Sequence, residues 1–249
     1  MQPLLRWLGL VLAAVLALQL FFVVRIAAMT VINPQSTTFE RSEMWRLFAE
    51  KGTIAWRQHW VAYPDIANNL KRAVITSEDD SFTNHDGVDW DALEKAWQKN
   101  IKAEASVAKK AEAARAQGNN PPTTRAPKVV GGSTITQQLA KNLFLSGERT
   151  LLRKGQEFVL TLLLETLLTK ERILEIYLNN VEWGEGVFGA EAAAQHYFRK
   201  PASRLSTYEA ARLAVMLPRP RYFENLPNSS YLAGRTQVIV RRLNSAELP

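Results

Sequence analysis

The chain has 249 residues, with 31 basic and 24 acidic side chains and a formal net charge of +7. It contains no cysteine, which excludes disulfides, thiol catalysis and thiolate metal sites. A chain of this length can bury one domain core, and its positive charge favours anionic partners such as phosphates or lipid headgroups. The sequence carries no RNA- or DNA-binding motif, so no nucleic acid is expected as a partner.

The first predicted element is an apolar segment near the N-terminus. Residues 7–24 read WLGLVLAAVLALQLFFVV, without a charge and with Gln19 as the only clearly polar residue. Continued to Met29, the segment reaches the roughly 20 residues that span a bilayer. The alternative is a cleaved signal peptide, but the segment is long for one, and Arg25 occupies the place of a small-residue cleavage site. We therefore expect residues 1–29 to form a cytoplasmic stub and a retained transmembrane anchor.

The next segment, residues 30–64, is mixed and is interpreted as a linker and entry segment with a short helix near Met44 to Phe48. From Asp65 to Ile75 the apolar residues recur on one face, which predicts a helix with Asp65 as its N-cap. Residues 101–128 are rich first in Ala, Lys and Glu and then in turn-forming residues. We expect a flexible, solvated insertion there, whose first half could extend a helix from Trp90.

Helical spacing dominates the remainder of the chain. Five segments have apolar residues at the helical period, namely 134–145, 151–168, 170–178, 190–198 and 208–216. Ser206 and Glu209 predict a capping box for the last of them. The segment from Phe158 to Leu168 is nearly all aliphatic, so that helix is expected to be buried. Alternating strands are nearly absent, and the predicted fold class is mainly α.

An acidic cluster follows the helix that is predicted to start at Asp65. Glu78, Asp79 and Asp80 are consecutive, and His85 lies a few residues beyond them. General acid/base chemistry needs a carboxylate whose pKa is raised by burial or by a neighbour of like charge, and adjacent acids can divide the two roles. The alternative is a set of solvated acids at a helix end.

A glycine turn feeds the start of the helix at residue 134. In Gly131-Gly132-Ser133-Thr134, glycines and hydroxyls precede the helix, whose free N–H groups and dipole would favour a phosphate. Gln137 and Lys141 are four residues apart, and Gln138 continues a stripe from Thr134 to Lys141. The alternative is ordinary capping by Ser133 or Thr134 with a solvated polar face.

Basic residues also open the next predicted helix. Arg153 and Lys154 precede Glu157, and such a pair at the mouth of an aliphatic helix suits a multiply charged anion. The alternative is surface charge with a favourable acid in the first turn. The three histidines lie far apart in the sequence without a paired spacing, so a zinc site is not expected.

Taken together, these strings resemble the glycosyltransferase domain of peptidoglycan synthases, a lysozyme-like family shared with class A penicillin-binding proteins. The matching motifs occur in order over residues 72–222. They are Glu78-Asp79-x-x-Phe82-x-x-His85-x-Gly87, Gly132-Ser133-Thr134-Ile135-Thr136-Gln137-Gln138-x-x-Lys141-Asn142, Arg153-Lys154-x-x-Glu157, Lys170-x-x-Ile173-Leu174-Glu175-x-Tyr177-Leu178-Asn179, the small residues Gly184, Gly186, Gly189 and Ala190, and Leu217-Pro218-x-Pro220-x-Tyr222.

The resemblance implies a lysozyme-like glycosyltransferase domain over residues 65–245. It also implies a monofunctional member of the family, since no Lys-Thr-Gly signature or room for a transpeptidase domain is found. The implied reaction polymerises lipid II into β-1,4-linked glycan strands, with inversion at the anomeric carbon and release of undecaprenyl diphosphate. Glu78 would be the general base, and Glu157 the second catalytic acid, which orients cations or a divalent metal.

The resemblance also implies a substrate-binding set. Its members are Asp79, Ser133, Thr134, Gln137, Gln138, Lys141, Asn142, Arg153, Lys154, Tyr177 and Asn179. Of these, Ser133, Gln138, Lys141, Arg153 and Lys154 would hold the donor diphosphate, whereas Asp79 and His85 would also brace the Glu78 loop. No cofactor is obligatory, although Mg²⁺ or Mn²⁺ could accompany the diphosphate. No resident metal site is expected.

The expected location is the bacterial inner membrane, with a single span and the catalytic domain in the periplasm. The expected partners are lipid II, the growing glycan chain and the membrane, together with proteins of cell-wall synthesis and division. Two other functions stay open at this point. A lysozyme-like hydrolase or lytic transglycosylase would also use one glutamate, but it needs no anion cradle. A non-catalytic membrane scaffold would need no base.

Overall fold

The computed structural model describes residues 2–116, 132–148 and 150–249, and it is mainly helical, as the sequence predicts. Its long helices are α1 (Gln2–Ala28), α2 (Thr38–Lys51), α3 (Asn68–Glu78), α4 (Trp90–Ala116), α5 (Ile135–Phe144), α6 (Leu151–Leu167), α7 (Lys170–Asn180), α8 (Ala190–Phe198), α9 (Thr207–Met216), α10 (Pro220–Glu224) and α11 (Ser230–Arg242). Its strands are β1 (Arg57–Gln58), β2 (Glu182–Gly184) and β3 (Val187–Phe188).

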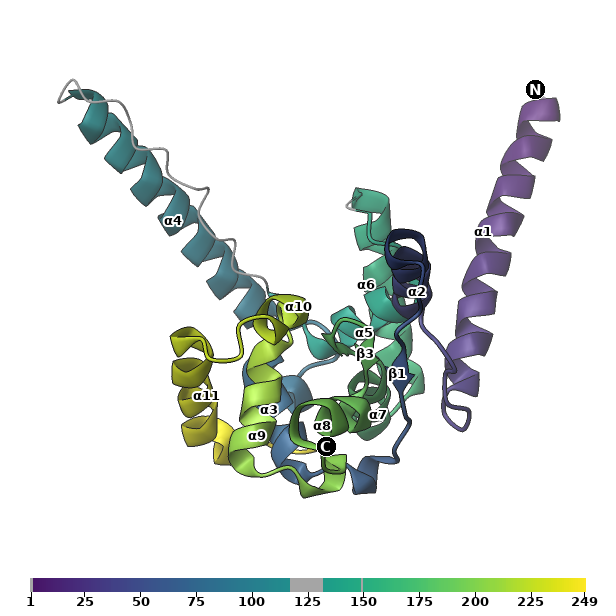
Figure 1. Cartoon of the computed structure of the whole chain (residues 1–249). Helices are drawn as coiled ribbons and strands as arrows, with labels where there is room; N and C mark the ends of the chain where they lie inside the picture. The colour runs from purple at the N-terminus through teal and green to yellow at the C-terminus, as the bar shows by residue number, and fades with distance from the viewer. Residues whose placement is uncertain (1, 117–131, 149) are drawn as a thin grey trace.

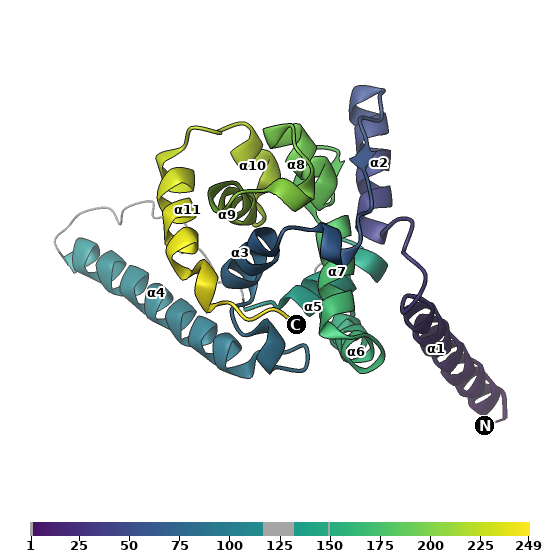
Figure 2. The same cartoon turned by 90° about the horizontal axis from the view of Figure 1, so that it is seen from below.

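The core forms where the amphipathic helices turn their apolar faces toward one another. Helix α3 packs against α9, α9 packs against α11, and α5 packs against α6 (Figures 1 and 2). Leu70 of α3, Leu139 of α5 and Leu213 of α9 are fully or almost fully buried in this core. Because α3 lies between the α9–α11 pair and the α5–α7 group, its C-terminal end emerges at the centre of the molecule (Figure 2). Glu78 is the last residue of α3.

The strands form one small sheet in the order β1-β3-β2. Strand β1 is parallel to β3, with Arg57 opposite Val187, and β2 is antiparallel to β3 with a bulge. The turn between β2 and β3 needs glycine, because Gly186 has a φ of +70° and a Cβ there would lie 1.9 Å from the carbonyl oxygen of Ala55. The sheet therefore fixes the segment before α3 against the segment after α7.

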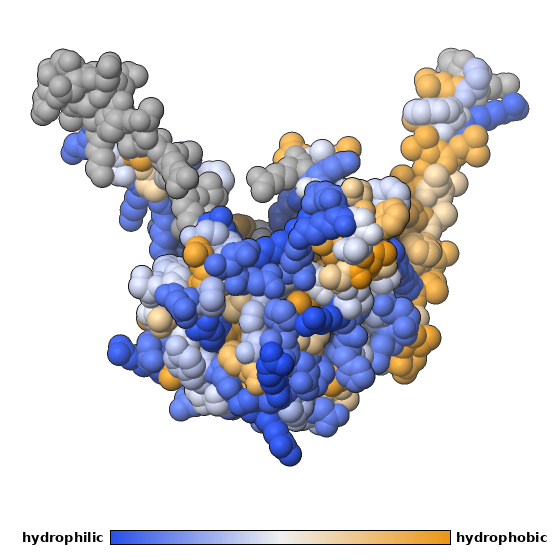
Figure 3. All heavy atoms as spheres, in the orientation of Figure 1, coloured by the Kyte–Doolittle hydropathy of each residue, from blue (hydrophilic) through white to orange (hydrophobic). Residues whose placement is uncertain are grey.

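Helix α1 extends away from the domain and carries the apolar segment. Residues 3–28 are long and apolar enough to cross a membrane, and most of their surface is uncovered (Figures 1 and 3). Its last turns dock on the domain, where the Phe22 ring lies 5.4 Å from that of Phe144. Gln19, the only clearly polar residue in the segment, donates a 3.0 Å hydrogen bond to Gln156 of α6. The contact with α6 accounts for a polar residue at this position.

Several local predictions are confirmed. Helices α5 to α9 coincide with the five predicted segments to within one or two residues at most ends, and the Ser206–Glu209 capping box is present. The first half of the insertion does continue the helix from Trp90, and α4 is helical to Ala116. Residues 117–128 of the insertion lie outside the described residues.

Two local predictions are wrong. Asp65 does not cap a helix: it ends a 3-10 turn over Tyr63–Asp65, and α3 begins three residues later with Ala67 as its N-cap. The turn takes this place because Pro64 fits the first positions of a helical turn. Helix α6 is also not buried on all sides, since Phe158 is 39% and Leu162 is 41% exposed.

Candidate active site

Glu78 is held at the end of α3 by a hydrogen-bond chain. Its Oε2 accepts a 3.0 Å hydrogen bond from Nε2 of Gln138 in α5, and its Oε1 lies 3.5 Å from the Ser77 hydroxyl. The hydroxyl of the buried Tyr177 donates a 3.0 Å hydrogen bond to Oε1 of Gln138. Because the Gln138 oxygen already accepts from Tyr177, its amide nitrogen is the atom that faces Glu78.

The environment of Glu78 suits a general base. Burial raises the pKa of its carboxyl above the ordinary 4.5, and the charge of Asp79 acts in the same direction. The hydrogen bonds from Gln138 and Ser77 and the charge of Lys141 oppose this rise. A carboxylate with a raised pKa holds an abstracted proton more firmly than a solvated one does, which is what general-base catalysis needs.

Asp79 braces the loop beside the base. Its Oδ2 accepts a 3.0 Å hydrogen bond from the backbone N–H of Ile135, and its Oδ1 lies 2.9 Å from Nε2 of His85. The backbone N–H of Gly87 donates to Nδ1 of His85 at 3.1 Å, so the proton of the neutral ring lies on Nε2 and is donated to Asp79. Asp79 is buried and therefore ties the segment after α3 to the start of α5.

The start of α5 differs from the predicted phosphate cradle. The Thr134 hydroxyl and the Gln137 side chain form a capping box, and Thr134 also donates a 2.6 Å hydrogen bond to the Gly87 carbonyl. The N–H of Ile135 goes to Asp79. Three N–H groups of the predicted cradle, those of Thr134, Ile135 and Gln137, are thus bonded to the protein's own acceptors, and Thr134 and Gln137 are both buried. Gly131 of the predicted cradle lies outside the described residues.

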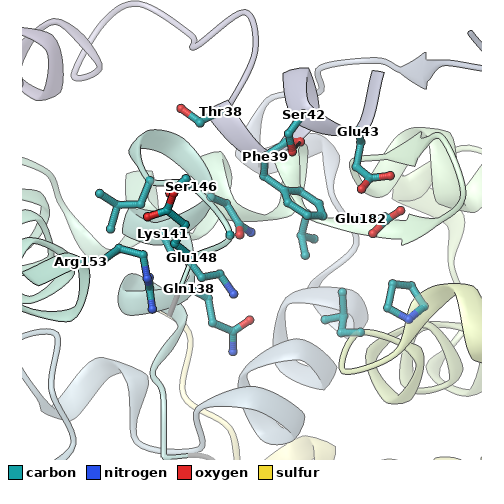
Figure 4. Close-up of a pocket in the computed structure, with 16 residues that line it drawn as sticks. Thr38, Phe39, Ser42, Glu43, Gln138, Lys141, Ser146, Glu148, Arg153 and Glu182 are labelled. Atoms are coloured by element: carbon teal, nitrogen blue, oxygen red, sulfur yellow. Dashed lines mark hydrogen bonds between the residues drawn. The ribbon is translucent and has the colours of Figure 1, made fainter. Parts of the chain in front are cut away.

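Three of the five residues predicted to hold the diphosphate, Gln138, Lys141 and Arg153, instead meet in a cleft of about 600 Å³ between α2, α5 and α6, whereas Lys154 does not line it. Gln138, Lys141 and Arg153 lie on one side of it, and Phe39 of α2 lies on the other side (Figure 4). Asn142 also lines the cleft. Nε of Arg153 is buried without a hydrogen-bond partner among the described residues. The cleft therefore offers cationic donors to an anion.

Lys141 is exposed at this cleft yet crowded by protein atoms. Desolvation lowers the pKa of its ammonium group from 10.5, as do the charges of Arg153 and Lys154, while the charges of Glu157 and Glu78 oppose the change. A phosphate bound beside three cations would relieve this mutual repulsion.

Glu157 organises the cations of α6. It is buried, its Oε2 accepts a 2.8 Å hydrogen bond from Arg153, and its Oε1 pairs with Lys154. Both carboxylate oxygens are therefore engaged by cations. In the part of the chain that the structure describes, no group of three or more acidic, histidine or cysteine residues gathers to hold a metal ion. These residues do not fit a resident Mg²⁺ or Mn²⁺.

Other predicted residues lie outside this cleft. Ser133 lines a second cavity, which also contains Glu78, and is not grouped with Lys141 and Arg153. Asn179 is fully buried; its amide bonds the backbone of Val61 in both directions at 2.9 Å and that of Glu175. These contacts hold the segment before α3 against α7.

The sequence reasoning missed the acidic wall of the cleft. Glu43 of α2 and Glu182 of β2 both line the cleft (Figure 4). They share Arg221, whose Nε lies 2.7 Å from Glu182 and whose NH2 lies 2.5 Å from Glu43. Burial raises the pKa of Glu182, and the hydrogen bond from Arg221 opposes this. No local motif marks these residues, because the ion pairs join three distant segments.

Comparison with known proteins identifies the family to which this chain belongs. The family model described as transglycosylase matches residues 47–110 and 110–244, which include Glu78, Lys141 and Arg153 but not the cleft residues Phe39 and Glu43 of α2. The chain belongs to the transglycosylase family. It is 53% identical over 248 residues to the biosynthetic peptidoglycan transglycosylase of Burkholderia thailandensis, covering 98% of this chain and 88% of that relative. It is 50% identical over 250 residues to that of Herminiimonas arsenicoxydans, covering 100% and 99%.

The chain also matches some of these relatives over almost their whole length. The relative from Janthinobacterium sp. is 51% identical over 251 residues, covering 100% of this chain and 99% of the relative. This match therefore includes α1 and the long helix α4.

Proposed function

We propose that this transglycosylase polymerises lipid II, with Glu78 as the general base of an inverting glycosyl transfer. The family and its relatives give the reaction class: the chain is a peptidoglycan glycosyltransferase that builds glycan strands. The observation that carries the residue assignment is the Glu78–Gln138 hydrogen bond, which lies between the cationic cleft and the second cavity.

In the proposed step, Glu78 takes the proton from the 4-hydroxyl of the acceptor's N-acetylglucosamine. That oxygen attacks the anomeric carbon of the donor's terminal N-acetylmuramic acid, and the bond from this carbon to the diphosphate oxygen breaks. Attack from the face opposite the leaving group converts an α-linked diphosphate to a β-1,4 bond. The proton remains on Glu78, and the electron pair of the broken bond leaves with undecaprenyl diphosphate.

The cleft supports the departure of the diphosphate. Lys141 and Arg153 would hold its phosphoryl oxygens, because charge develops there as the bond breaks and preformed cations stabilise it without reorganisation. Asn142 and Gln138, which also line the cleft, add amide donors. Glu157 keeps Arg153 and Lys154 in place. No step is routed through a metal ion.

Four predicted binding residues are assigned positioning roles in this proposal. Asp79 and Thr134 hold the loop that carries the base, and Tyr177 orients the Gln138 amide. Asn179 supports the same wall from behind, through backbone contacts that leave its amide no free donor. We therefore expect substitutions at these four positions to disturb the geometry of the base before they disturb affinity for the donor.

The chain is a membrane-associated cell-wall enzyme with one apolar N-terminal helix that could span a membrane. We place the helix as a retained single-pass anchor in the inner membrane, with the catalytic domain in the periplasm. The docking of Gln19 on Gln156 supports retention, since a cleaved segment would leave Gln156 and Phe144 uncovered. Leu151 and Leu152 at the start of α6, which are 92% and 89% exposed, would rest in the bilayer surface.

Polymerisation of purified lipid II by the full chain tests the proposal. Replacement of Glu78 by Gln should lower turnover by about 10²- to 10⁴-fold, because it removes the proton acceptor while keeping its size. Glu104→Gln, an exposed change on α4, serves as the matched control. Retained polymerisation by a folded Glu78→Gln protein would overturn the assignment of the base. Soluble fragments released from finished sacculi would instead favour the hydrolase.

A further inference from the structure

A second cavity of about 470 Å³ lies on the other side of Glu78 from the cationic cleft. Its walls come from the end of α3, the first turns of α4, the segment before α5, and α11. Four cations line it, two from α4 and two from α11: Lys95, Lys99, Arg235 and Arg242. The cavity thus brings together basic residues from two helices that are far apart in the sequence.

The cations of this cavity have more spare hydrogen-bonding capacity than its acids, of which Asp80 is half exposed and pairs with Arg242 through Oδ2 alone. Among the described residues, Lys95, Lys99 and Arg235 make no ion pair and no side-chain hydrogen bond, whereas Arg242 lies 2.6 Å from Asp80. Asp89 accepts from the Ser81 hydroxyl and from the N–H of Ala92.

Asp79 is likewise engaged, by His85 and the N–H of Ile135. Apart from the base, the groups left to meet a ligand are therefore mostly donors, and donors of positive charge select an anion.

Two hydroxyl groups in the cavity also indicate that it binds a ligand. Thr76 lines the cavity, is only 4% exposed, and its hydroxyl has no hydrogen-bond partner among the described residues. Ser133 also lines it, exposed and without a side-chain hydrogen bond in the described part of the chain. A buried hydroxyl without a partner costs stability, which a ligand oxygen would recover.

We propose that this cavity binds an anionic group of the acceptor substrate, through Lys95, Lys99 and Arg235. The proposal rests on the proposed function, in which Glu78 activates the acceptor sugar, because the cavity adjoins that carboxylate. The group bears carboxylate or phosphate oxygens. A lipid-linked disaccharide-pentapeptide has both kinds, on its peptide stem and on its diphosphate. Binding either one would hold the 4-hydroxyl of the acceptor at the base.

The test compares steady-state polymerisation of lipid II by the full chain and by the double variant Lys99→Gln/Arg235→Gln. We expect the apparent KM to rise about five- to tenfold at low salt, with kcat changed less than about twofold, since each exposed charge contributes modestly. The difference should shrink as salt is added. Both residues lack ion pairs, so the double variant should unfold at the wild-type temperature.

Lys102→Gln is the matched control, because Lys102 is exposed on α4 and does not line the cavity. An unchanged KM in the folded double variant, or an equal change in Lys102→Gln, would overturn the proposal. Lipid II with amidated stem carboxylates then identifies the group. If amidation raises the wild-type KM and removes the difference between wild type and variant, the stem carboxylates bind here; if the difference persists, the diphosphate does.

Failure of the cavity proposal can be distinguished from failure of the proposed function. Glu78→Gln reports on kcat, whereas the cavity variants report on KM. If Glu78→Gln retained its turnover, the role of the base would fail, and the KM comparison would still show whether the cavity recognises an anion.

Discussion

The Gln138 amide donates a 3.0 Å hydrogen bond to the Glu78 carboxylate, and this contact joins two helices that come from separate motifs. Glu78 ends α3 and Gln138 lies in the second turn of α5. The same amide group accepts from Tyr177 of α7, so three helices fix the position of one carboxylate. Catalytic groups held in this way need little reorganisation during the reaction.

Replacement of Gln138 by Ala should move the acidic limb of the pH–rate profile to higher pH. The Glu78 base works when ionised, so the rate falls as the pH drops through its pKa. The hydrogen bond from Gln138 lowers that pKa, which burial has raised, and removing it leaves the burial effect less opposed. Profiles of kcat/KM for both proteins check this.

Tyr177→Phe offers a graded comparison in the same assay, because it frees the Gln138 amide without deleting it. A smaller shift in the same direction is expected. A shift of the acidic limb to lower pH in Gln138→Ala would contradict the assigned role of the hydrogen bond.

Arg153 should be needed as a planar, two-pronged donor and not only as a charge. Arg153→Ala is expected to lower kcat/KM by about 10- to 100-fold, since charge-assisted hydrogen bonds to phosphate are among the strongest. Arg153→Lys should recover only part of this loss, because an ammonium lacks the guanidinium fork that also pairs with Glu157. Arg241→Gln, an exposed cation of α11, is the matched control. Full recovery by lysine would show that charge alone matters here.

The helices could be predicted because their signals are local. Apolar periodicity fixed α5 to α9, and the Ser206–Glu209 spacing predicted a cap that the structure contains. The roles at the start of α5 could not be predicted in this way. Glycines and hydroxyls before a helix indicate unsatisfied N–H groups, but only the fold shows that Asp79, 56 residues earlier, takes one of them.

The burial of α6 shows a related limit. An aliphatic run predicts a buried helix in water, whereas Phe158 and Leu162 remain exposed in a chain that also carries a helix able to span a membrane. Composition measures how apolar a surface is and does not distinguish a protein core from a lipid surface. The pairing of Glu43, Glu182 and Arg221 depends on three segments meeting, so no local pattern marks it.

The free energy of unfolding should fall as the pH rises from about 5 to 8, because Glu40 loses its proton in the folded protein. Burial raises the pKa of this carboxyl from 4.5 to about 7, against the hydrogen bonds from Thr37 and Gln58. The folded state therefore binds a proton that the unfolded state has lost, and this contribution is complete below pH 4.5 and lost as the pH rises through 7. The difference corresponds to at most about 3 kcal/mol. Thermal unfolding of Glu40→Gln should show a flatter pH dependence than the wild type, and an equally steep one would contradict the assignment.

Gly87 should be intolerant of a side chain, because it combines a left-handed backbone with close packing. Its φ is +85°, and a Cβ would lie 2.6 Å from Cγ2 of Thr161. Strain and overpacking together predict that Gly87→Ala lowers the free energy of unfolding by about 2 to 4 kcal/mol. Gly234→Ala is the matched comparison, with nothing within 4 Å of its Cβ in α11, and should stabilise by about 0.5 to 1 kcal/mol.

The Gly87 substitution should also lower kcat by displacing Glu78, and this effect distinguishes it from a substitution that only destabilises the fold. The Gly87 N–H holds His85, and its carbonyl accepts from Thr134, so a displaced backbone loosens both partners of the Asp79 brace. We expect kcat to fall at temperatures where Gly87→Ala is still folded, while Gly234→Ala keeps the wild-type value. Wild-type kcat in folded Gly87→Ala would show that the brace does not position Glu78.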